Sequence, residues 1–373
     1  MDALMLPLNW QKVRLGDIGK PCMCKRVMKH QTTRYGEIPF YKIGTFGNTA
    51  DAFISKKLFL EYKTKYSFPK KGDILISASG TIGRAVIYDG KPAYFQDSNI
   101  VWIDNDETLV KNDFLFYAYS NVKWNTEHTT ILRLYNDNFR NTLIPLPPLN
   151  EQNAIANILS GLDRYLCALD ALILKKEGVK KALSFELLSQ RKRLKGFNQA
   201  WQRVRFGDIA NYLTSNLSAE QITQQGKIKV YDVNNFIGYT DTTFISDKPY
   251  ISIVKDGSVG RVRILPPKTN ILSTMGALIA NHRTTTEFLF YLLSNFDFKN
   301  FTSGSIIPHI YFKDYKEKTI FLPPPNEQSA IANVLSALDN EITSLKNKKR
   351  QFENIKKALN HDLMSAKIRV LKK

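Results

Sequence analysis

The chain has 373 residues, of which 43% are hydrophobic and 12% aromatic, a composition too apolar for a disordered protein. The length corresponds to two or three domains, each able to bury a core. Lys and Arg number 53 against 34 acidic residues, and the resulting net charge of +19 favours a polyanionic partner, nucleic acid first, over a merely basic surface or a ribosome- or membrane-surface protein.

The N-terminal residues 1–7 show no basic segment followed by a long apolar run, and no stretch approaches 18 apolar residues. We therefore expect no signal peptide and no membrane span, while the basic tail at 366–373 is expected to fray. Cys22, Cys24 and Cys167 are too few for a disulfide framework and fit a reducing cytoplasm. Cys22 and Cys24 lack a second ligand pair, so ordinary thiols are favoured over a metal site.

The first 149 residues are typical of an α+β globule. Short apolar runs at 74–76 and 85–88 predict strands between glycines and prolines, and residues 112–120 predict a short helix. The run SASGTIG at 77–83 lacks the Lys-Ser/Thr ending of a P-loop. A tight turn between strands, with glycines at positive φ, is the favoured interpretation, and its amides could still meet a DNA phosphate.

Basic and aromatic residues alternate in this globule, as expected of a surface that holds phosphates and reads base edges. Each residue taken singly could equally be a solvated charge. The candidate DNA-binding residues of the first half are Arg26, Lys29, His30, Arg34, Lys42, Ser79, Thr81, Arg84 and Arg133.

A long helix is predicted after residue 149. Asn150 follows two prolines and is a suitable N-cap, Glu and Gln suit the first turn, and no proline occurs up to about residue 190. Apolar residues recur at steps of four and three, which is typical of a coiled coil. They are Ile155, Leu159, Leu162, Leu166 and Leu169, and Lys176 and Lys180 interrupt the series further on.

The second half of the chain repeats the first. Residues 10–18 (WQKVRLGDI) return at 201–209 (WQRVRFGDI), 79–84 (SGTIGR) at 256–261 (DGSVGR), and 147–163 (PPLNEQNAIANILSGLD) at 323–339 (PPPNEQSAIANVLSALD). Because the separation between copies falls from 191 to 176, the second half has lost 15 residues before the last of these motifs. The chain is a duplicated unit of globule and helix.

The second globule is expected to repeat the first, with a strand at 251–254 and a helix at 286–294. Its candidate DNA-binding residues are Lys255, Ser258, Arg261, Arg263, Ser305 and His309. The second long helix carries the apolar series Ile331, Leu335, Leu338, Ile342 and Leu345, with Lys349 and Lys356 interrupting it. A lone helix would expose such a series, so we expect the two long helices to pair, antiparallel, within one chain.

Residues for catalysis are not evident. The sequence contains neither GxxxxGK[ST] nor HExxH, and no Asn-Pro-Pro-aromatic tetrapeptide of the kind an amino-methyltransferase uses for its flipped base. The five histidines have no paired spacing. We expect no catalytic residue and no metal site, although a carboxylate pair close only in space cannot be read from sequence.

The duplicated motifs at 10–18 and 147–163, together with the GSIIPH stretch at 304–309, resemble the specificity (S) subunit of type I restriction–modification systems. The resemblance covers essentially the whole chain. It implies target recognition domains at 1–149 and 196–325, and conserved helical arms at 150–195 and 326–373. In the first half the GSIIPH stretch is degraded to EHTTILR at 127–133, which suggests that Arg133 and His309 are equivalent and that the two domains read different sequences.

The resemblance also implies partners. Double-stranded DNA would be read as an asymmetric bipartite site with half-sites about one helical turn, roughly 10 base pairs, apart. Methyltransferase (M) subunits would dock on the helices and motor-nuclease (R) subunits would join them. S-adenosylmethionine, ATP and Mg²⁺ would bind those partners and not this chain. The alternatives are the recognition subunit of a type IIB-like or orphan modification system, a non-specific DNA-bridging protein, and a stand-alone enzyme.

Overall fold

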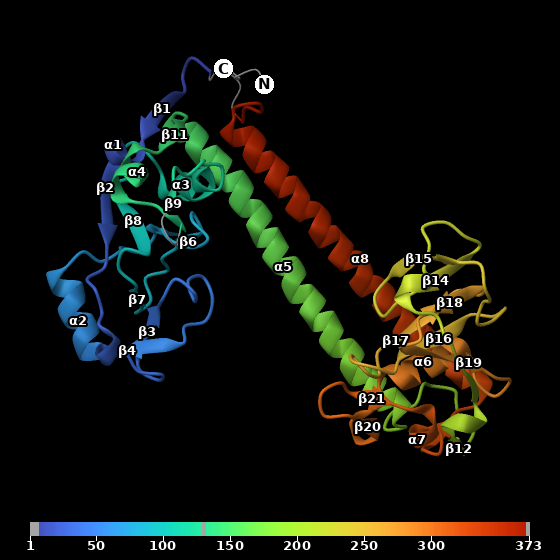
Figure 1. Cartoon of the computed structure of the whole chain (residues 1–373). Helices are drawn as coiled ribbons and strands as arrows, with labels where there is room; N and C mark the ends of the chain where they lie inside the picture. Colours follow the sequence, from blue (N-terminus) through green and yellow to red (C-terminus); the bar gives the residue numbers. More distant parts are fainter. Residues whose placement is uncertain (1–6, 129–131, 371–373) are drawn as a thin grey trace. The chain divides into compact units, whose positions relative to one another are not determined.

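The computed structural model describes residues 7–128 and 132–370. The expectations for the first six residues, for the centre of the 127–133 stretch and for the last three residues of the basic tail lie outside this range. The chain forms two compact units. Unit 1 takes its described residues from Met1–Leu169 and Lys348–Lys373, and unit 2 is Asp170–Asn347. Both long helices, α5 (Leu149–Leu188) and α8 (Pro325–Met364), contribute to both units (Figure 1).

Unit 1 combines a four-stranded sheet of order β2-β8-β5-β6, a three-stranded sheet β4-β3-β7, and the pairs β1-β11 and β9-β10. Its strands are β1 (Gln11–Arg14), β2 (Gly19–Met23), β3 (Ile38–Tyr41), β4 (Ala52–Ile54), β5 (Ile74–Ser77), β6 (Ala85–Ile87), β7 (Tyr94–Phe95), β8 (Ile100–Asn105), β9 (Glu127–His128), β10 (Leu132–Arg133) and β11 (Leu143–Leu146). Its short helices are α1 (Leu15–Ile18), η1 (Lys29–Gln31), α2 (Lys56–Lys65), α3 (Asn112–Tyr119) and α4 (Asn136–Asn141).

Unit 2 repeats this topology strand for strand, with the sheets β13-β19-β16-β17 and β15-β14-β18 and the pairs β12-β22 and β20-β21. Its strands are β12 (Gln202–Arg205), β13 (Ala210–Thr214), β14 (Ile228–Tyr231), β15 (Phe236–Thr240), β16 (Tyr250–Val254), β17 (Val262–Leu265), β18 (Thr269–Ile271), β19 (Met275–Ala280), β20 (Thr302–Ser303), β21 (His309–Ile310) and β22 (Thr319–Leu322). Its short helices are η2 (Phe206–Asp208), η3 (Ala219–Gln221), α6 (Thr286–Ser294), η4 (Lys299–Phe301) and α7 (Phe312–Tyr315).

The strands and short helices expected from sequence are confirmed, and the α+β class with internal duplication holds. The fully buried strands β5 and β16 lie inside the four-stranded sheets, as their continuous apolar runs require. Helix α2 accounts for most of the length difference between the halves. It occupies the connection between β4 and β5, where unit 2 has only a short loop between β15 and β16. The Ser55 side chain caps it by accepting from the Leu58 amide.

The long helices begin one residue earlier than predicted. Asn150 lies inside α5, and its side chain accepts from the neighbouring Glu151 amide instead of capping the helix. The amides of Glu151 and Gln152 both donate to the Pro148 carbonyl. In α8 the first residue is Pro325, whose missing N–H would have no helical partner at that position. The second proline of each Pro-Pro pair, Pro148 or Pro324, therefore directly precedes its helix and accepts from amides of the first turn.

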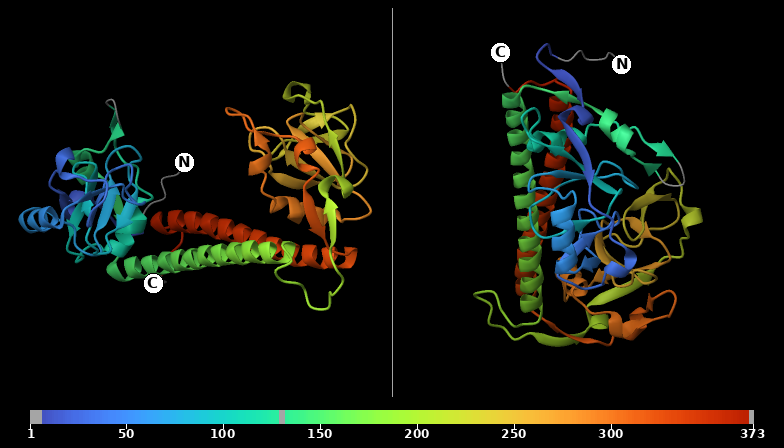
Figure 2. Two further views of the ribbon diagram at one scale, coloured as in Figure 1. Left: turned by 90° about the horizontal axis from the view of Figure 1, so that it is seen from below. Right: turned by 90° about the vertical axis from the view of Figure 1, so that its left-hand side faces the viewer.

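Within each unit the α5 and α8 segments run antiparallel (Figure 2). Residues further along α5 pair with residues that come earlier in α8. In unit 1 Asp163 pairs with Lys356, and the rings of Tyr165 and Phe352 lie 4.7 Å apart. In unit 2 Lys176 pairs with Glu341 at 2.8 Å and Lys180 with Asp339 at 2.5 Å. Three of the four lysines that interrupt the apolar series, Lys176, Lys180 and Lys356, therefore make ion pairs across the helix pair. Lys349 pairs with Glu353 on its own helix.

The predicted packing residues fall into two groups. Ile155, Leu159, Ile331 and Leu335 are almost fully buried, and they join the core of a globule beside residues from the end of the opposite helix. Leu169 and Ile342 are also buried. The others are only half-buried, so the helix pair is covered less completely than a uniform coiled coil: these are Leu162, Leu166, Leu338 and Leu345.

A buried carboxylate joins each globule to the long helices. Glu151, 2% exposed, lies in the first turn of α5, where it accepts from the Trp10 indole at 3.1 Å. Arg369, just beyond the end of α8, donates to both Glu151 oxygens at 2.6 and 2.8 Å. Arg–carboxylate pairs of this bidentate geometry combine strength with fixed orientation. The start of the globule and the ends of both helices thus meet on one side chain.

Unit 2 repeats this anchor with the helices exchanged. Glu327 of α8 accepts from the Trp201 indole at 3.0 Å and from two nitrogens of Arg193, which follows α5, at 3.0 and 2.6 Å. The neighbouring glutamines act in the same way in both units: Gln152 and Gln328 hold the backbone at the start of α3 and α6, respectively. The repeated Trp and Asn-Glu-Gln motifs are therefore the two sides of one joint.

A second contact reinforces each joint further along the helices. The Tyr117 hydroxyl of α3 donates to Asp163 at 2.7 Å, and Lys356 reaches the same carboxylate while lying over the Tyr117 ring. Tyr291, Asp339 and Lys180 repeat this arrangement in unit 2. Burial and the adjacent carboxylate raise the pKa of Tyr117 and Tyr291 well above the usual range, so both hydroxyls stay protonated donors.

We expect Glu327→Gln to lower the free energy of unfolding by about 2 kcal/mol, because it removes the charge from the hydrogen bonds that this buried carboxylate accepts from Arg193 and Trp201. The measurement is urea unfolding followed by circular dichroism. The matched control is Glu61→Gln in the exposed Lys65 pair on α2, where the expected change is below about 0.5 kcal/mol. Equal effects of the two substitutions would show that the buried ion pair contributes no more to the free energy of unfolding than the exposed one.

Candidate nucleic-acid interface

In unit 1 the glycine-rich turn between β5 and β6 lies against the β9–β10 hairpin. Gly80 and Gly83 have φ of +65° and +84°, as the sequence predicted for a turn between strands. Ser79 forms a backbone bridge with Arg133, and the Ala78 carbonyl accepts from the Leu134 amide at 2.9 Å. Turn and hairpin therefore form one element at the edge of the globule.

Unit 2 builds the same element from different side chains. Asp256, which precedes the turn glycine, bridges His309 of β21, and their side chains meet at 2.7 Å between Nδ1 and Oδ1. The Gly257 amide donates to the Pro308 carbonyl at 2.9 Å. Arg133 and His309 thus occupy equivalent places, as their alignment suggested. The scaffold is shared, and the side chains it presents differ.

The structure brings nine of the predicted DNA-binding residues to these two elements. In unit 1 they are Ser79, Thr81, Arg84 and Arg133, and in unit 2 they are Lys255, Ser258, Arg261, Ser305 and His309. Ser79 is buried and its hydroxyl donates to Asn99, so that hydroxyl is not free to contact DNA. Arg84 donates to the Phe46 carbonyl at 3.0 Å. Direct base contact by these residues stays a prediction.

The remaining predicted residues lie elsewhere in their globules. Arg263 of β17 stacks over the Tyr231 ring and donates to the Asn234 carbonyl at 2.9 Å. Lys42 pairs with Asp51 at 2.9 Å, and Arg26 pairs with Asp97 at 2.8 Å. Three others occupy or follow the exposed η1 turn: they are Lys29, His30 and Arg34.

A short polar loop between β7 and β8 connects several of these residues in unit 1. Gln96 accepts from the Ile43 amide, Asp97 holds Arg26, and Asn99 accepts from the Ser79 hydroxyl at 2.8 Å. Sequence reasoning missed this loop because it contains no basic residue. Its only signal is the polar run QDSN between two apolar segments.

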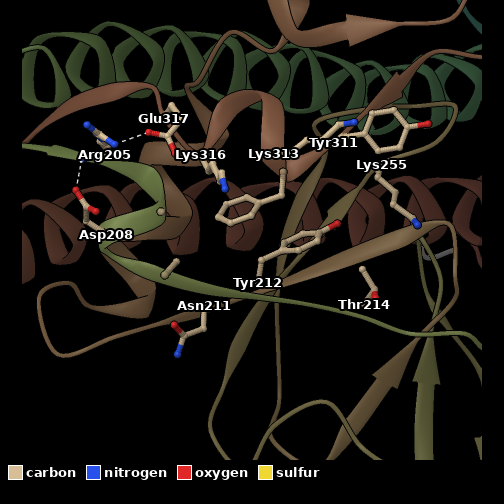
Figure 3. Close-up of a pocket in the computed structure, with 13 residues that line it drawn as sticks. Arg205, Asp208, Asn211, Tyr212, Thr214, Lys255, Tyr311, Lys313, Lys316 and Glu317 are labelled. Atoms are coloured by element: carbon tan, nitrogen blue, oxygen red, sulfur yellow. Dashed lines mark hydrogen bonds and ion pairs between the residues drawn. The ribbon is translucent and has the colours of Figure 1, made fainter.

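A cleft of about 760 Å³ lies beside the hairpin in unit 2 (Figure 3). Lys255, Lys313 and Lys316 line it, and the Tyr212 ring stacks on Phe312 at 4.7 Å. Burial raises the pKa of Tyr212, so its hydroxyl remains protonated near neutral pH. A basic cleft with aromatic walls suits a nucleic-acid backbone. Tyr212 and Lys313 were not among the predicted residues.

The cysteines of the CxC pair lie on and directly after β2. Burial raises the pKa of Cys22 and raises that of Cys24 to about 12, so both remain thiols at neutral pH. Over residues 7–128 and 132–370 we find no group of three or more His, Cys, Asp or Glu side chains that could hold a metal ion. In the same ranges no helix combines the length and apolarity needed to cross a bilayer.

Residues 7–176 and 198–354 both match the family model described as the type I restriction modification DNA specificity domain. A Haemophilus influenzae protein provisionally assigned as a type I restriction enzyme specificity subunit is 64% identical over 148 residues, which span 39% of this chain and 38% of that protein. The MjaVIII specificity subunit of Methanocaldococcus jannaschii is 25% identical over 99% of this chain and 95% of its own length.

Two solved structures share the fold. The crystal structure of the type I S subunit from M. genitalium matches with a TM-score of 0.64 at 19% identity, over 96% of this chain and 98% of that one. A chain from a structural study of complex assembly in the type I restriction–modification system matches with a TM-score of 0.60 at 16% identity, over the same shares.

The turn in unit 2 depends on the absence of a side chain at Gly260. A Cβ there would lie 2.6 Å from the buried Phe298 ring, whereas a Cβ on Gly257 would meet nothing within 4 Å. Both residues have positive φ, +78° and +83°. We expect Gly257→Ala to cost about 1 kcal/mol of unfolding free energy and Gly260→Ala about 3 kcal/mol. Thermal unfolding of the two variants tests this difference, and similar losses would contradict it.

Proposed function

Because the chain belongs to the family of type I restriction–modification DNA specificity proteins, we propose that each of its globules reads one half of a bipartite DNA site. Its role is recognition, and catalysis belongs to other subunits. The observation that carries the proposal is the duplicated turn-and-hairpin element, which gathers nine candidate contact residues on two copies of one scaffold. The net charge of +19 supports a DNA partner.

The target is asymmetric. At equivalent places unit 1 presents Arg133, and unit 2 presents His309 paired with Asp256. A guanidinium donates to guanine O6 and N7, whereas a His–Asp pair offers a different set of donors and acceptors. Two globules with these side chains select different base pairs, although their strands follow one topology.

The long helices set the spacing of the half-sites and receive methyltransferase subunits, with motor-nuclease subunits joining the assembled complex. Large apolar side chains left exposed along α5 and α8 support a docking role. They include Ile158, Leu172, Leu174, Val179, Phe185 and Ile355. We place S-adenosylmethionine, ATP and Mg²⁺ in those partners, and the assembly in the cytoplasm, with three free thiols on this chain in support.

Methylome sequencing of a host with and without this gene, expressed with its methyltransferase, tests the proposal. We expect one bipartite motif with two different halves and an unread spacer, half-site centres lying roughly 10 base pairs apart. Methylation without a fixed motif would favour a non-specific DNA-bridging protein and would contradict the assignment.

A matched insertion tests the role of the helices. Seven residues added after Leu172 in α5 and seven after Leu345 in α8 preserve the antiparallel register, because these positions are opposed in it. One heptad lengthens a helix by roughly 10 Å, or about three base pairs of DNA. The spacer should grow by that amount while both half-sequences stay the same. Altered half-sequences would argue against a spacing role, and an insertion in α5 alone should destabilise the pair.

A further inference from the structure

Two large aliphatic side chains at the tip of the β20–β21 hairpin are exposed to solvent. Ile306 is 92% exposed and Ile307 54%. The hairpin projects from unit 2 on the side away from the long helices (Figure 2). The two neighbouring side chains form a small continuous apolar patch, and exposed apolar patches on soluble proteins mark contact surfaces.

The base of the hairpin is fixed, so the tip is held ready for contact. The Ile310 amide donates to the Lys255 carbonyl at 2.9 Å, and the Gly257 amide donates to that of Pro308. Gly304 has φ of +90°, and a Cβ there would lie 2.2 Å from the Ile307 carbonyl oxygen. A tip held in this way loses little conformational entropy when it binds.

The cleft at the base of the hairpin is lined by several basic residues. The adjacent cleft holds Lys255, Lys313 and Lys316, and among the described residues none of the three has an ion-pair partner within 4 Å. Its arginine, Arg205, is already paired with Glu317 at 2.6 Å. Lys313 lies over the Tyr311 ring. Three ammonium groups at the base of the hairpin, without an ion pair among the described residues, and two isoleucines at its tip match a phosphate backbone that flanks apolar base surfaces. A docking site for another protein would need a larger apolar area than two side chains provide.

We propose that Ile306 and Ile307 insert into a groove of the half-site read by unit 2 and make apolar contact with its bases, while Lys255, Lys313 and Lys316 hold the neighbouring phosphates. Apolar side chains contact the thymine methyl group in the major groove and wedge into base steps from the minor groove. The inference rests on the proposed function and adds to it a contact through which unit 2 senses bases without hydrogen bonds.

The test uses the full chain assembled with its methyltransferase subunit and a duplex carrying the site mapped by methylome sequencing. The Ile306→Ser/Ile307→Ser variant should bind this duplex roughly 10- to 100-fold more weakly, with an unchanged slope of log affinity against log salt, because no charge is lost. The Lys255→Gln/Lys313→Gln variant should reduce the magnitude of that slope by about 1.8, or 0.9 for each lost phosphate contact. All four side chains are at least partly exposed, and circular dichroism confirms folding.

A base-substitution series separates the two half-sites. In the isoleucine variant, discrimination should weaken in one half-site and stay unchanged in the other. Unaltered affinity and discrimination would overturn the inference while leaving the proposed function intact. Loss of methyltransferase binding in the absence of DNA would assign the tip to a protein interface and would also overturn it. A wild-type complex that methylates no defined site would instead overturn the proposed function and the inference together.

Discussion

Each globule is attached to the long helices through one buried carboxylate. This carboxylate lies in the first turn of one long helix and binds the start of the globule and the segment that follows the other long helix. Glu151 and Glu327 are almost fully buried, and each is satisfied by one indole and one bidentate guanidinium. Such a pair tolerates little displacement, because an unpartnered buried charge is costly. The joint therefore holds the globule at a defined orientation on the first turn of one helix, and the adjacent Tyr–Asp–Lys contact extends it along the pair.

The residues that attach each globule to the long helices differ from the residues proposed to contact DNA. Two of the three recurring motifs supply the joint: the Trp that opens each globule, and the Glu, Gln and Asp of each long helix. The third forms the glycine-rich turn. The turn and hairpin keep their backbone bridge, but Ser79 and Arg133 are replaced by Asp256 and His309. The same joint can therefore position two recognition elements of different specificity.

The sequence was sufficient for the architecture because its signals are local or repeated. The Pro-Pro and Asn-Glu-Gln motifs located the starts of both long helices to within one residue, whereas the helices end seven and nine residues before the predicted arms do. The duplicated motifs implied two equivalent globules. The site was harder to predict, since contacts such as Arg26 with Asp97 join residues 71 apart. The loop at Gln96–Asn99 is marked in the sequence only by a short polar run, and no sequence pattern marks Tyr212, which lines the cleft. The roles of Lys176, Lys180 and Lys356 were likewise clear only once their acidic partners on the opposite helix were known.

The antiparallel course of the helices within one chain is the central claim, and cysteine cross-linking tests it most directly. In a variant with Cys22, Cys24 and Cys167 replaced by serine, Tyr165→Cys/Phe352→Cys should form a disulfide, because those rings are neighbours at 4.7 Å. The pair Tyr165→Cys/Glu341→Cys, opposed only if the helices ran parallel, should not. Peptide mapping identifies the linked segments. Cross-linking of 165 to 341 in preference to 352 would contradict the account.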